Sequence, residues 1–180
     1  MKFKALFLAT SCAIAFSSTA SAATPIVEFR GEVTDQTCKA SINSQTDSVV
    51  MLSTVSTADF NTVGATSTPT PFTINIEDCA MDTADLEIGT TFLGYNVTPN
   101  GNLGNQDTSG NAATGVSIQL TQNADGSRPV TLNGPTTVPG LTLAAGATSA
   151  SYDFGAQYYA EDVPTAGTVK AAAEYTLSYN

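Results

Sequence analysis

The chain has 180 residues, a formal net charge of −10 and no histidine. The absence of histidine excludes a Ser-His-Asp or Cys-His catalytic arrangement. An acidic surface repels phosphate backbones and anionic lipids, so we expect neither nucleic acid nor a membrane surface as a partner.

Residues 1–22, MKFKALFLATSCAIAFSSTASA, have the three parts of a secretory signal peptide. A basic region with two lysines comes first, an apolar run follows, and Ala-Ser-Ala forms the cleavage site. We therefore expect this segment to be removed and the mature chain to begin at Ala23. The mature chain keeps four basic residues against 16 acidic ones, a net charge of 4 − 16 = −12.

Two cysteines, Cys38 and Cys79, remain in the mature chain. An even pair in an exported chain predicts a disulfide. It would close a loop of roughly 41 residues and stabilise the fold by about 4 kcal/mol in the chain-entropy model. Two thiolates without histidine do not make a metal site, and no phosphate-binding motif is present, so we expect no metal and no cofactor.

Apolar and polar residues alternate with a period of two along much of the mature chain, which predicts β-strands. Turn-forming pairs such as Asn100-Gly101 and Asp125-Gly126 lie between these stretches. No segment has a clear helical period, so the sequence predicts one all-β sandwich or barrel. The alternating stretches are residues 27–33, 72–76, 116–120, 152–158 and 169–179.

Two other segments have no such alternation. The apolar residues 49–52 are typical of a strand buried on both faces. Residues 96–114 are rich in Thr, Asn and Gly, and we expect them to form a long surface loop.

An acidic cluster surrounds the second cysteine, over residues 77–87. Paired carboxylates could serve a glycosidase, and several carboxylates could bind calcium. In a chain this acidic, a solvated role is the simpler interpretation. An exported enzyme that uses Asp82 and Asp85 remains a third hypothesis, and our prediction is that the chain is not an enzyme.

Taken together, these stretches resemble the chaperone–usher fimbrial subunits, like the type 1 pilins. The matching stretches are ATPIVEFRGEVTDQTC before the first cysteine, PFTINIEDC up to the second, ATGVSIQL, and the C-terminal region from SYDFGAQYYA onward. In that family, a glycine fourteen residues from the end and a penultimate tyrosine mark the last strand. Here these residues are Gly167 and Tyr179.

This resemblance implies an incomplete immunoglobulin-like sandwich with six strands of its own and a seventh supplied in trans. Addition of a strand from another chain in this way is a known example of β-augmentation. The implied organisation is a signal peptide at 1–22, a donor-strand extension at 23–33 and a pilin domain at 34–180.

The resemblance also implies which residues make the contact between subunits. The donor strand would present Val27, Phe29, Gly31 and Val33 to the next subunit, and its glycine would face a shallow part of the groove. The acceptor groove would be lined by the C-terminal strand, through Gly167, Val169, Ala171, Ala173, Tyr175, Leu177 and Tyr179.

The function implied by the resemblance is that of a structural subunit of an adhesive surface fimbria. Neighbouring subunits, a periplasmic chaperone and an outer-membrane usher are the implied partners, and head-to-tail contacts that do not close would give a filament. The implied route runs through the periplasm to the cell surface. A minor or tip-proximal subunit that binds a glycan or receptor is the alternative.

Overall fold

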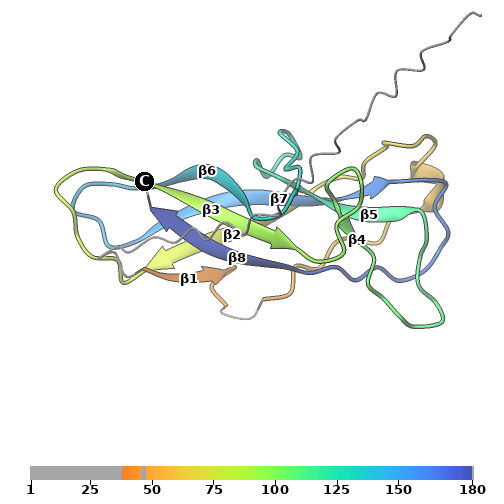
Figure 1. Cartoon of the computed structure of the whole chain (residues 1–180), viewed down its shortest axis with the longest axis horizontal. Helices are drawn as coiled ribbons and strands as arrows, with labels where there is room; N and C mark the ends of the chain where they lie inside the picture. Colours follow the sequence, from red (N-terminus) through yellow and green to blue (C-terminus); the bar gives the residue numbers. More distant parts are fainter. Residues whose placement is uncertain (1–37, 46–47, 180) are drawn as a thin grey trace, which may run out of the picture. The chain divides into compact units, whose positions relative to one another are not determined.

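Two β-sheets make up the part of the chain that the computed structural model describes, residues 38–45 and 48–179 (Figure 1). A short 3₁₀ helix, η1 (Thr57–Asp59), lies between the first two strands. The strands are β1 (Lys39–Ile42), β2 (Thr70–Glu77), β3 (Leu86–Gly94), β4 (Leu103–Gly104), β5 (Val116–Thr121), β6 (Thr136–Leu143), β7 (Ala150–Ala160) and β8 (Ala173–Tyr179).

The first sheet has the strand order β1-β2-β7-β5-β4, and the second has the order β6-β3-β8. All pairs between these strands are antiparallel. This arrangement confirms the predicted all-β, immunoglobulin-like sandwich. The described residues form eight strands where we expected six, and one of them, β4, has only two residues. The predicted signal peptide and donor segment lie outside the described residues.

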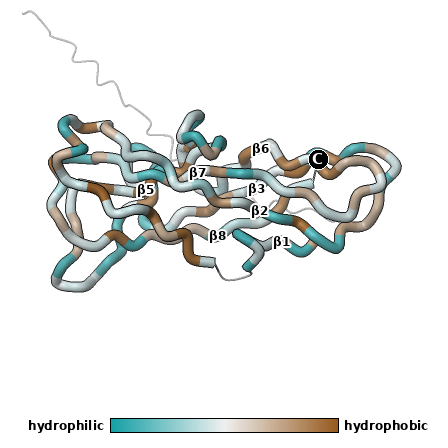
Figure 2. Tube along the Cα trace, turned by 180° about the vertical axis from the view of Figure 1, so that it is seen from behind, coloured by the Kyte–Doolittle hydropathy of each residue, from teal (hydrophilic) through white to brown (hydrophobic). Residues whose placement is uncertain are grey.

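Alternation along the strands builds the core between the sheets, and Figure 2 shows hydrophobic and paler residues alternating along the chain. In β2, Phe72, Ile74 and Ile76 are buried while their neighbours are more exposed. Phe72 stacks on Phe154 of β7 with ring centroids 5.7 Å apart, and Phe92 of β3 meets Phe154 edge-on at 5.4 Å. Such pairs add about 0.5–1.5 kcal/mol each beyond burial.

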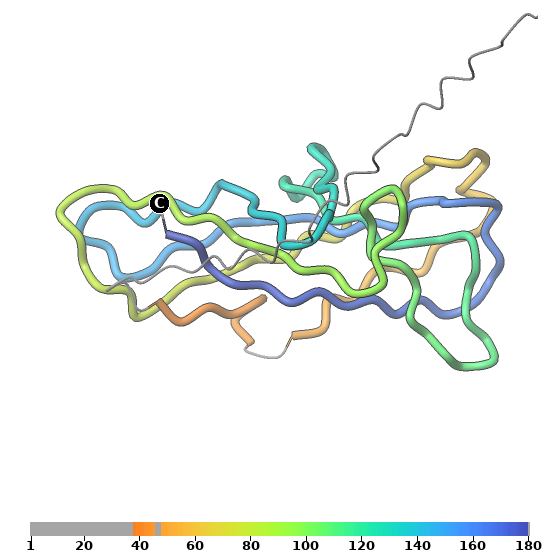
Figure 3. Tube along the Cα trace, in the orientation of Figure 1, coloured from red at the N-terminus to blue at the C-terminus, as the bar shows by residue number. Residues whose placement is uncertain are grey.

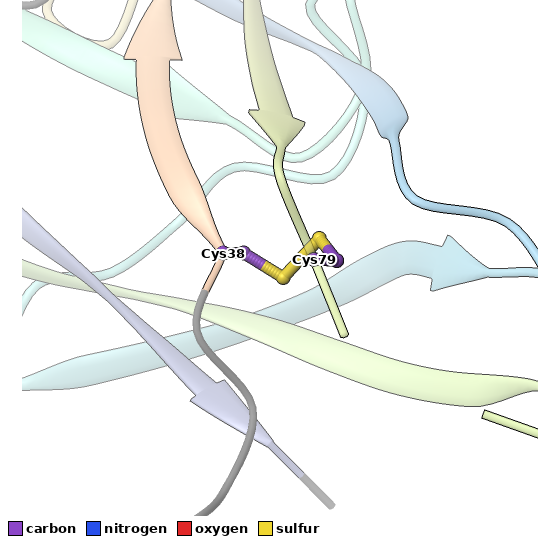
Figure 4. Close-up of a disulfide and its surroundings, with 2 residues drawn as sticks. All are labelled: Cys38 and Cys79. Carbon is purple, nitrogen blue, oxygen red and sulfur yellow. A yellow bond between two sulfur atoms is a disulfide. The ribbon is translucent and has the colours of Figure 1, made fainter. Parts of the chain in front are cut away.

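A second core cluster surrounds the disulfide between Cys38 and Cys79, which confirms the predicted pairing. The bond joins the start of β1 to the residues that follow β2 (Figure 4). Cys79 packs with the buried Ile88 and Leu141, and Leu177 of β8 lies against the same cluster. The disulfide therefore braces the end of the sandwich where the chain ends.

Several predicted boundaries differ from the structure. Residues 49–52 form no strand, and the prediction that both faces are buried is wrong, because Val49 and Met51 are 76% and 78% exposed. The predicted surface loop at 96–114 contains β4 and the buried Asn102. The last strand begins at Ala173, four residues later than the alternation predicts.

A tight turn at 122–128 follows β5, as its Asp-Gly pair predicts. The backbone N–H of Gln122 donates to the carbonyl of Arg128 at 2.9 Å, and Asp125 accepts from the N–H of Ser127 at 2.9 Å. Within the described residues, no helix is long and apolar enough to cross a bilayer. The same residues hold no cluster of three or more side chains suited to a metal ion.

Candidate functional site: a groove along the edge of the sandwich

An apolar groove runs between two segments of the chain, which we name the C-terminal wall (residues 164–179) and the opposite wall (residues 48–57). The groove consists of two hollows that follow one another along both walls. The first has a volume of about 310 Å³ and the second about 580 Å³. Figure 3 shows the C-terminal wall in dark blue and the opposite wall in orange.

The floor of the groove is the hydrophobic core itself. Phe72, Phe92 and Leu120, which belong to the core cluster, line the first hollow. Phe60 and Val116 line the second. Apolar side chains at the base of an open groove favour an apolar occupant, because their burial removes apolar surface from water.

The C-terminal wall is bonded to the rest of the fold along one edge. Within its last part, β8 pairs with β3, from Ala173 opposite Gly94 to Tyr179 opposite Ile88. Before β8, the carbonyls of Lys170 and Ala172 accept from the N–H groups of Gln106 and Tyr95 at 2.7 and 3.1 Å. Since successive main-chain groups of an extended chain point to opposite edges, those of Val169 and Ala171 face the groove.

Side chains and single main-chain hydrogen bonds, rather than a continuous strand partner, hold residues 165–172 of this wall. The side chain of Asn105 donates to the carbonyls of Ala113 and Thr168 at 2.9 Å each. Its oxygen accepts from the N–H groups of Asp107 and Lys170, also at 2.9 Å. Asn105 therefore uses its side-chain amide in four hydrogen bonds. These bonds join the loop between β4 and β5, residues 105–115, to the C-terminal wall.

Asp107 adds a second link between this loop and the wall. Its carboxylate accepts a hydrogen bond from the hydroxyl of Thr168 and one from the hydroxyl of Ser109 at 2.9 Å. The Thr168 bond is the main reason that the pKa of Asp107 is lowered.

Gly167 lies where the wall approaches the loop most closely. A Cβ atom at this position would meet the backbone N of Ala113 and the backbone O of Asn111, each at 2.5 Å. Backbone atoms cannot give way as a side chain can, so only glycine fits here. The glycine that marks the last strand in the sequence thus has a local packing reason.

Glu161, just before the C-terminal wall, anchors a different segment, residues 98–102 between β3 and β4. One carboxylate oxygen accepts from the hydroxyls of Thr98 and Ser117 at 2.7 Å each and from the amide of Asn102 at 3.1 Å. Asn100 donates to the other oxygen. Burial opposes ionisation, but these hydrogen bonds outweigh it and the pKa of Glu161 is lowered.

The structure places the predicted groove residues at different points along the wall. Gly167 and Val169 line the second hollow. Leu177 and Tyr179 pack against the cluster around the disulfide instead. The remaining three, Ala171, Ala173 and Tyr175, line the first hollow.

The opposite wall was not predicted from the sequence. Val50 and Leu52 pack against the core cluster, whereas Val49 and Met51 are exposed. Burial alternates between half-buried and exposed positions over residues 48–52, but residues 49–52 are all apolar in the sequence, so the sequence pattern gave no signal of this alternation. The structure gives the acidic cluster local roles, because Asp78 pairs with Lys39 at 2.8 Å and Asp85 accepts from the N–H of Ala145 at 2.8 Å.

Known proteins share both the sequence pattern and this fold. A family profile described as fimbrial protein matches residues 27–180. The major fimbrial subunit SMF-1 of Stenotrophomonas maltophilia (strain K279a) is 35% identical, over 89% of this chain and 95% of the relative. The type-1 fimbrial protein A chain of Escherichia coli (strain K12) is 32% identical, over 99% of this chain and 100% of the relative.

A solved structure supports the fold independently. The crystal structure of the P pilus rod subunit PapA superposes with a TM-score of 0.56 over 78% of this chain and 99% of that chain, at 20% identity. The chain belongs to the fimbrial protein family. It is a non-enzymatic structural subunit of a surface fimbria, built to assemble with other subunits.

Proposed function

We propose that the groove accepts residues 23–33 of a neighbouring copy, so that subunits polymerise head to tail by donor-strand exchange. The observation that carries this proposal is the apolar groove beside β8, a strand at the edge of its sheet. An edge strand presents main-chain groups to which an extended segment can add.

The donor segment has the pattern that such a groove requires. Val27, Phe29 and Val33 share one side of an extended chain, with Gly31 between them. Burying each of the three large apolar side chains is worth about 1.5–3 kcal/mol. Glu28, Arg30 and Glu32 share the other side and would remain in water.

On this proposal the subunit passes through the periplasm, where a chaperone covers the groove until an outer-membrane usher exchanges it for the donor segment of the next subunit. Each copy gives one strand and receives one, and the contact joins two different surfaces. Such a contact does not close on itself and extends into a filament. The filament would support adhesion of the cell that carries it.

The test uses the chain from Ala23 to Asn180 with two variants. Phe29→Asp removes the donor by placing a charge among apolar side chains. Ala173→Arg blocks the first hollow but keeps the donor. We expect that neither variant alone forms fibres, whereas an equimolar mixture forms a heterodimer on size-exclusion chromatography, because one working donor meets one working groove.

Arg30→Asp and Thr176→Arg are matched controls, since both place the same new residues on outward-facing positions. Thr176 is exposed in β8. Both controls should still assemble into fibres seen by electron microscopy. Fibres from Phe29→Asp alone, or a mixture that stays monomeric while each variant is folded, would refute donor-strand exchange.

A further inference from the structure

Asn-Gly pairs occur at two places in the chain, Asn100-Gly101 and Asn133-Gly134. The first pair belongs to the turn between β3 and β4, and the second lies just before β6. Gly101, Asn133 and Gly134 border one hollow of about 420 Å³. The backbone N–H of Leu132 donates to the carbonyl of Gly101 at 2.9 Å, so the two turns are in contact. The same dipeptide is therefore present twice, in neighbouring turns.

An asparagine that is followed by glycine is chemically labile. The backbone nitrogen of the glycine can attack the side-chain carbonyl carbon of the asparagine, and glycine has no Cβ atom to hinder the approach. The attack needs a backbone N–H that can lose its proton and an asparagine side chain that can turn toward it. Whether such a pair reacts therefore depends on the hydrogen bonds that hold these two groups.

Hydrogen bonds hold both groups in the first pair. The side-chain amide of Asn100 donates to the carboxylate of Glu161 at 2.5 Å. The backbone N–H of Gly101 donates to the carbonyl of Thr98 at 2.9 Å. A Cβ atom at Gly101 would meet the side chain of Thr131 at 2.5 Å, so this turn is also closely packed. These hydrogen bonds must break before the asparagine can react.

In the second pair, the described residues provide no such restraint. The side chain of Asn133 and the backbone N–H of Gly134 form no hydrogen bond with any described residue. Both residues are exposed, and a Cβ atom at Gly134 would meet no atom within 4 Å. The hydroxyl of Thr136 accepts from the N–H of Asn133 and donates to the carbonyl of Gly134, at 3.2 Å each. The side chain of Asn133 can therefore turn toward the nitrogen of Gly134.

We propose that Asn133 is a site of spontaneous deamidation, and that hydrogen bonds protect Asn100 from the same reaction. The nitrogen of Gly134 gives its proton to water and forms a bond to Cγ of Asn133. The Cγ–Nδ2 bond breaks, and Nδ2 leaves as ammonia with a proton from water. Water then opens the resulting succinimide ring at one of its two carbonyls, which leaves aspartate or isoaspartate. One water is consumed and one ammonia is released, and nothing is oxidised or reduced.

The product changes the charge and the main chain of this turn. Either product adds one negative charge to an acidic chain, and isoaspartate also lengthens the main chain by one carbon. The change lies outside the ladder between β6 and β3, which begins at Thr136 opposite Phe92. We therefore expect the modified subunit to keep its fold. Because the ammonia is lost and no enzyme is needed, the modified fraction should grow with the age of the subunit.

The experiment follows the folded chain from Ala23 to Asn180 at pH 7 and in mildly alkaline buffer. Samples taken over weeks are digested with chymotrypsin, and mass spectrometry measures deamidation at each asparagine. We expect Asn133 to deamidate at least about tenfold faster than Asn100, because the hydrogen bonds of the first pair must break before it reacts. The rate at Asn133 should rise with pH, because the glycine nitrogen reacts after losing its proton.

The chain unfolded in guanidinium chloride is the matched control, since it has the same dipeptides without the turns. There the two asparagines should deamidate at similar rates. Glu161→Ala removes the acceptor of the Asn100 amide and should accelerate deamidation at Asn100 but not at Asn133. If this variant does not fold, the folded and unfolded wild-type chains still decide. Equal rates at the two sites in the folded chain would overturn the inference, and so would a rate ratio that the unfolded chain reproduces.

Discussion

The two halves of the C-terminal wall are built in different ways. Residues 173–179 form β8, which is held by a regular ladder to β3 and by the cluster around the disulfide. Residues 165–172 form no strand and are held by Asn105, Asp107 and single main-chain hydrogen bonds to a loop. The C-terminal wall is therefore β-sheet in one half, whereas side chains and single main-chain hydrogen bonds hold the other half.

This difference shows which part of the wall depends on particular residues. A main-chain ladder tolerates many side chains, provided that the alternation is kept. A network centred on one amide depends on that amide, because each partner that loses its hydrogen bond must find another. Substitutions should therefore act differently in the two halves.

The largest effect on the free energy of unfolding should come from removing the disulfide, at the end of the sandwich that supports β8. Replacing Cys38 and Cys79 together with serine removes the cross-link and should lower the free energy of unfolding by about 4 kcal/mol. Equilibrium unfolding in urea measures the loss. Hydrogen exchange should then show faster opening at Ser178, which lies opposite Gly89 of β3, than at Lys170, because the neighbouring Leu177 packs against the disulfide cluster. Equal acceleration at both sites would contradict the division of the wall.

A smaller effect is expected at the other half from Gly167→Ala. The new Cβ would overlap backbone atoms of Ala113 and Asn111, so the wall or the loop must shift, at a cost of about 1–3 kcal/mol. Gly110→Ala is the control, because a Cβ there meets no atom within 4 Å. We expect urea unfolding to separate the two variants clearly. If the two variants are equally stable, the close approach of Gly167 to the loop backbone does not contribute to the free energy of unfolding.

The smallest effect is expected in the pH dependence of stability, through the carboxylate of Glu161. The pKa of Glu161 is lowered in the fold, so its contribution to stability is complete above the unfolded value of about 4.5 and is lost as the pH falls through the lower folded value. Glu161→Gln should therefore lower the free energy of unfolding at pH 7. As the pH falls below 5, the variant should lose less of this free energy than the wild-type protein does. Urea midpoints measured across that range test this. An unchanged pH profile would show that the Glu161 network contributes nothing.

The sequence was sufficient to predict the β-sheet half of the wall. Alternation from Ala173 to Tyr179 reports one half-buried face directly, because side chains of a strand alternate between faces. The disulfide followed from the number of cysteines. The central strands β2, β5 and β7 were also predicted from their alternation in the sequence, although burial alternates cleanly only in β2, because polar residues of the other two strands, such as Gln119 and Gln157, are buried as well.

The side-chain half could not be predicted. Its hydrogen bonds join Asn105 to residues more than sixty positions away, and no local pattern encodes such a partner. The loop that provides them is polar and resembles an ordinary surface segment. Strand β6 was missed for a related reason, because its Pro139-Gly140 pair resembles a turn although the strand continues through it.

The scarcity of basic residues affects how easily a protease can cut the subunit. A trypsin-like protease cuts after lysine or arginine, and the chain after residue 22 offers only Arg30, Lys39, Arg128 and Lys170. Lys39 lies in β1, Lys170 is bonded through its main chain to the loop, and Arg128 closes a hydrogen-bonded turn. Cleavage needs an unfolded stretch around the bond, and each of these three sites is tied into local structure. The composition that keeps the subunit acidic therefore also leaves a trypsin-like protease few sites to cut.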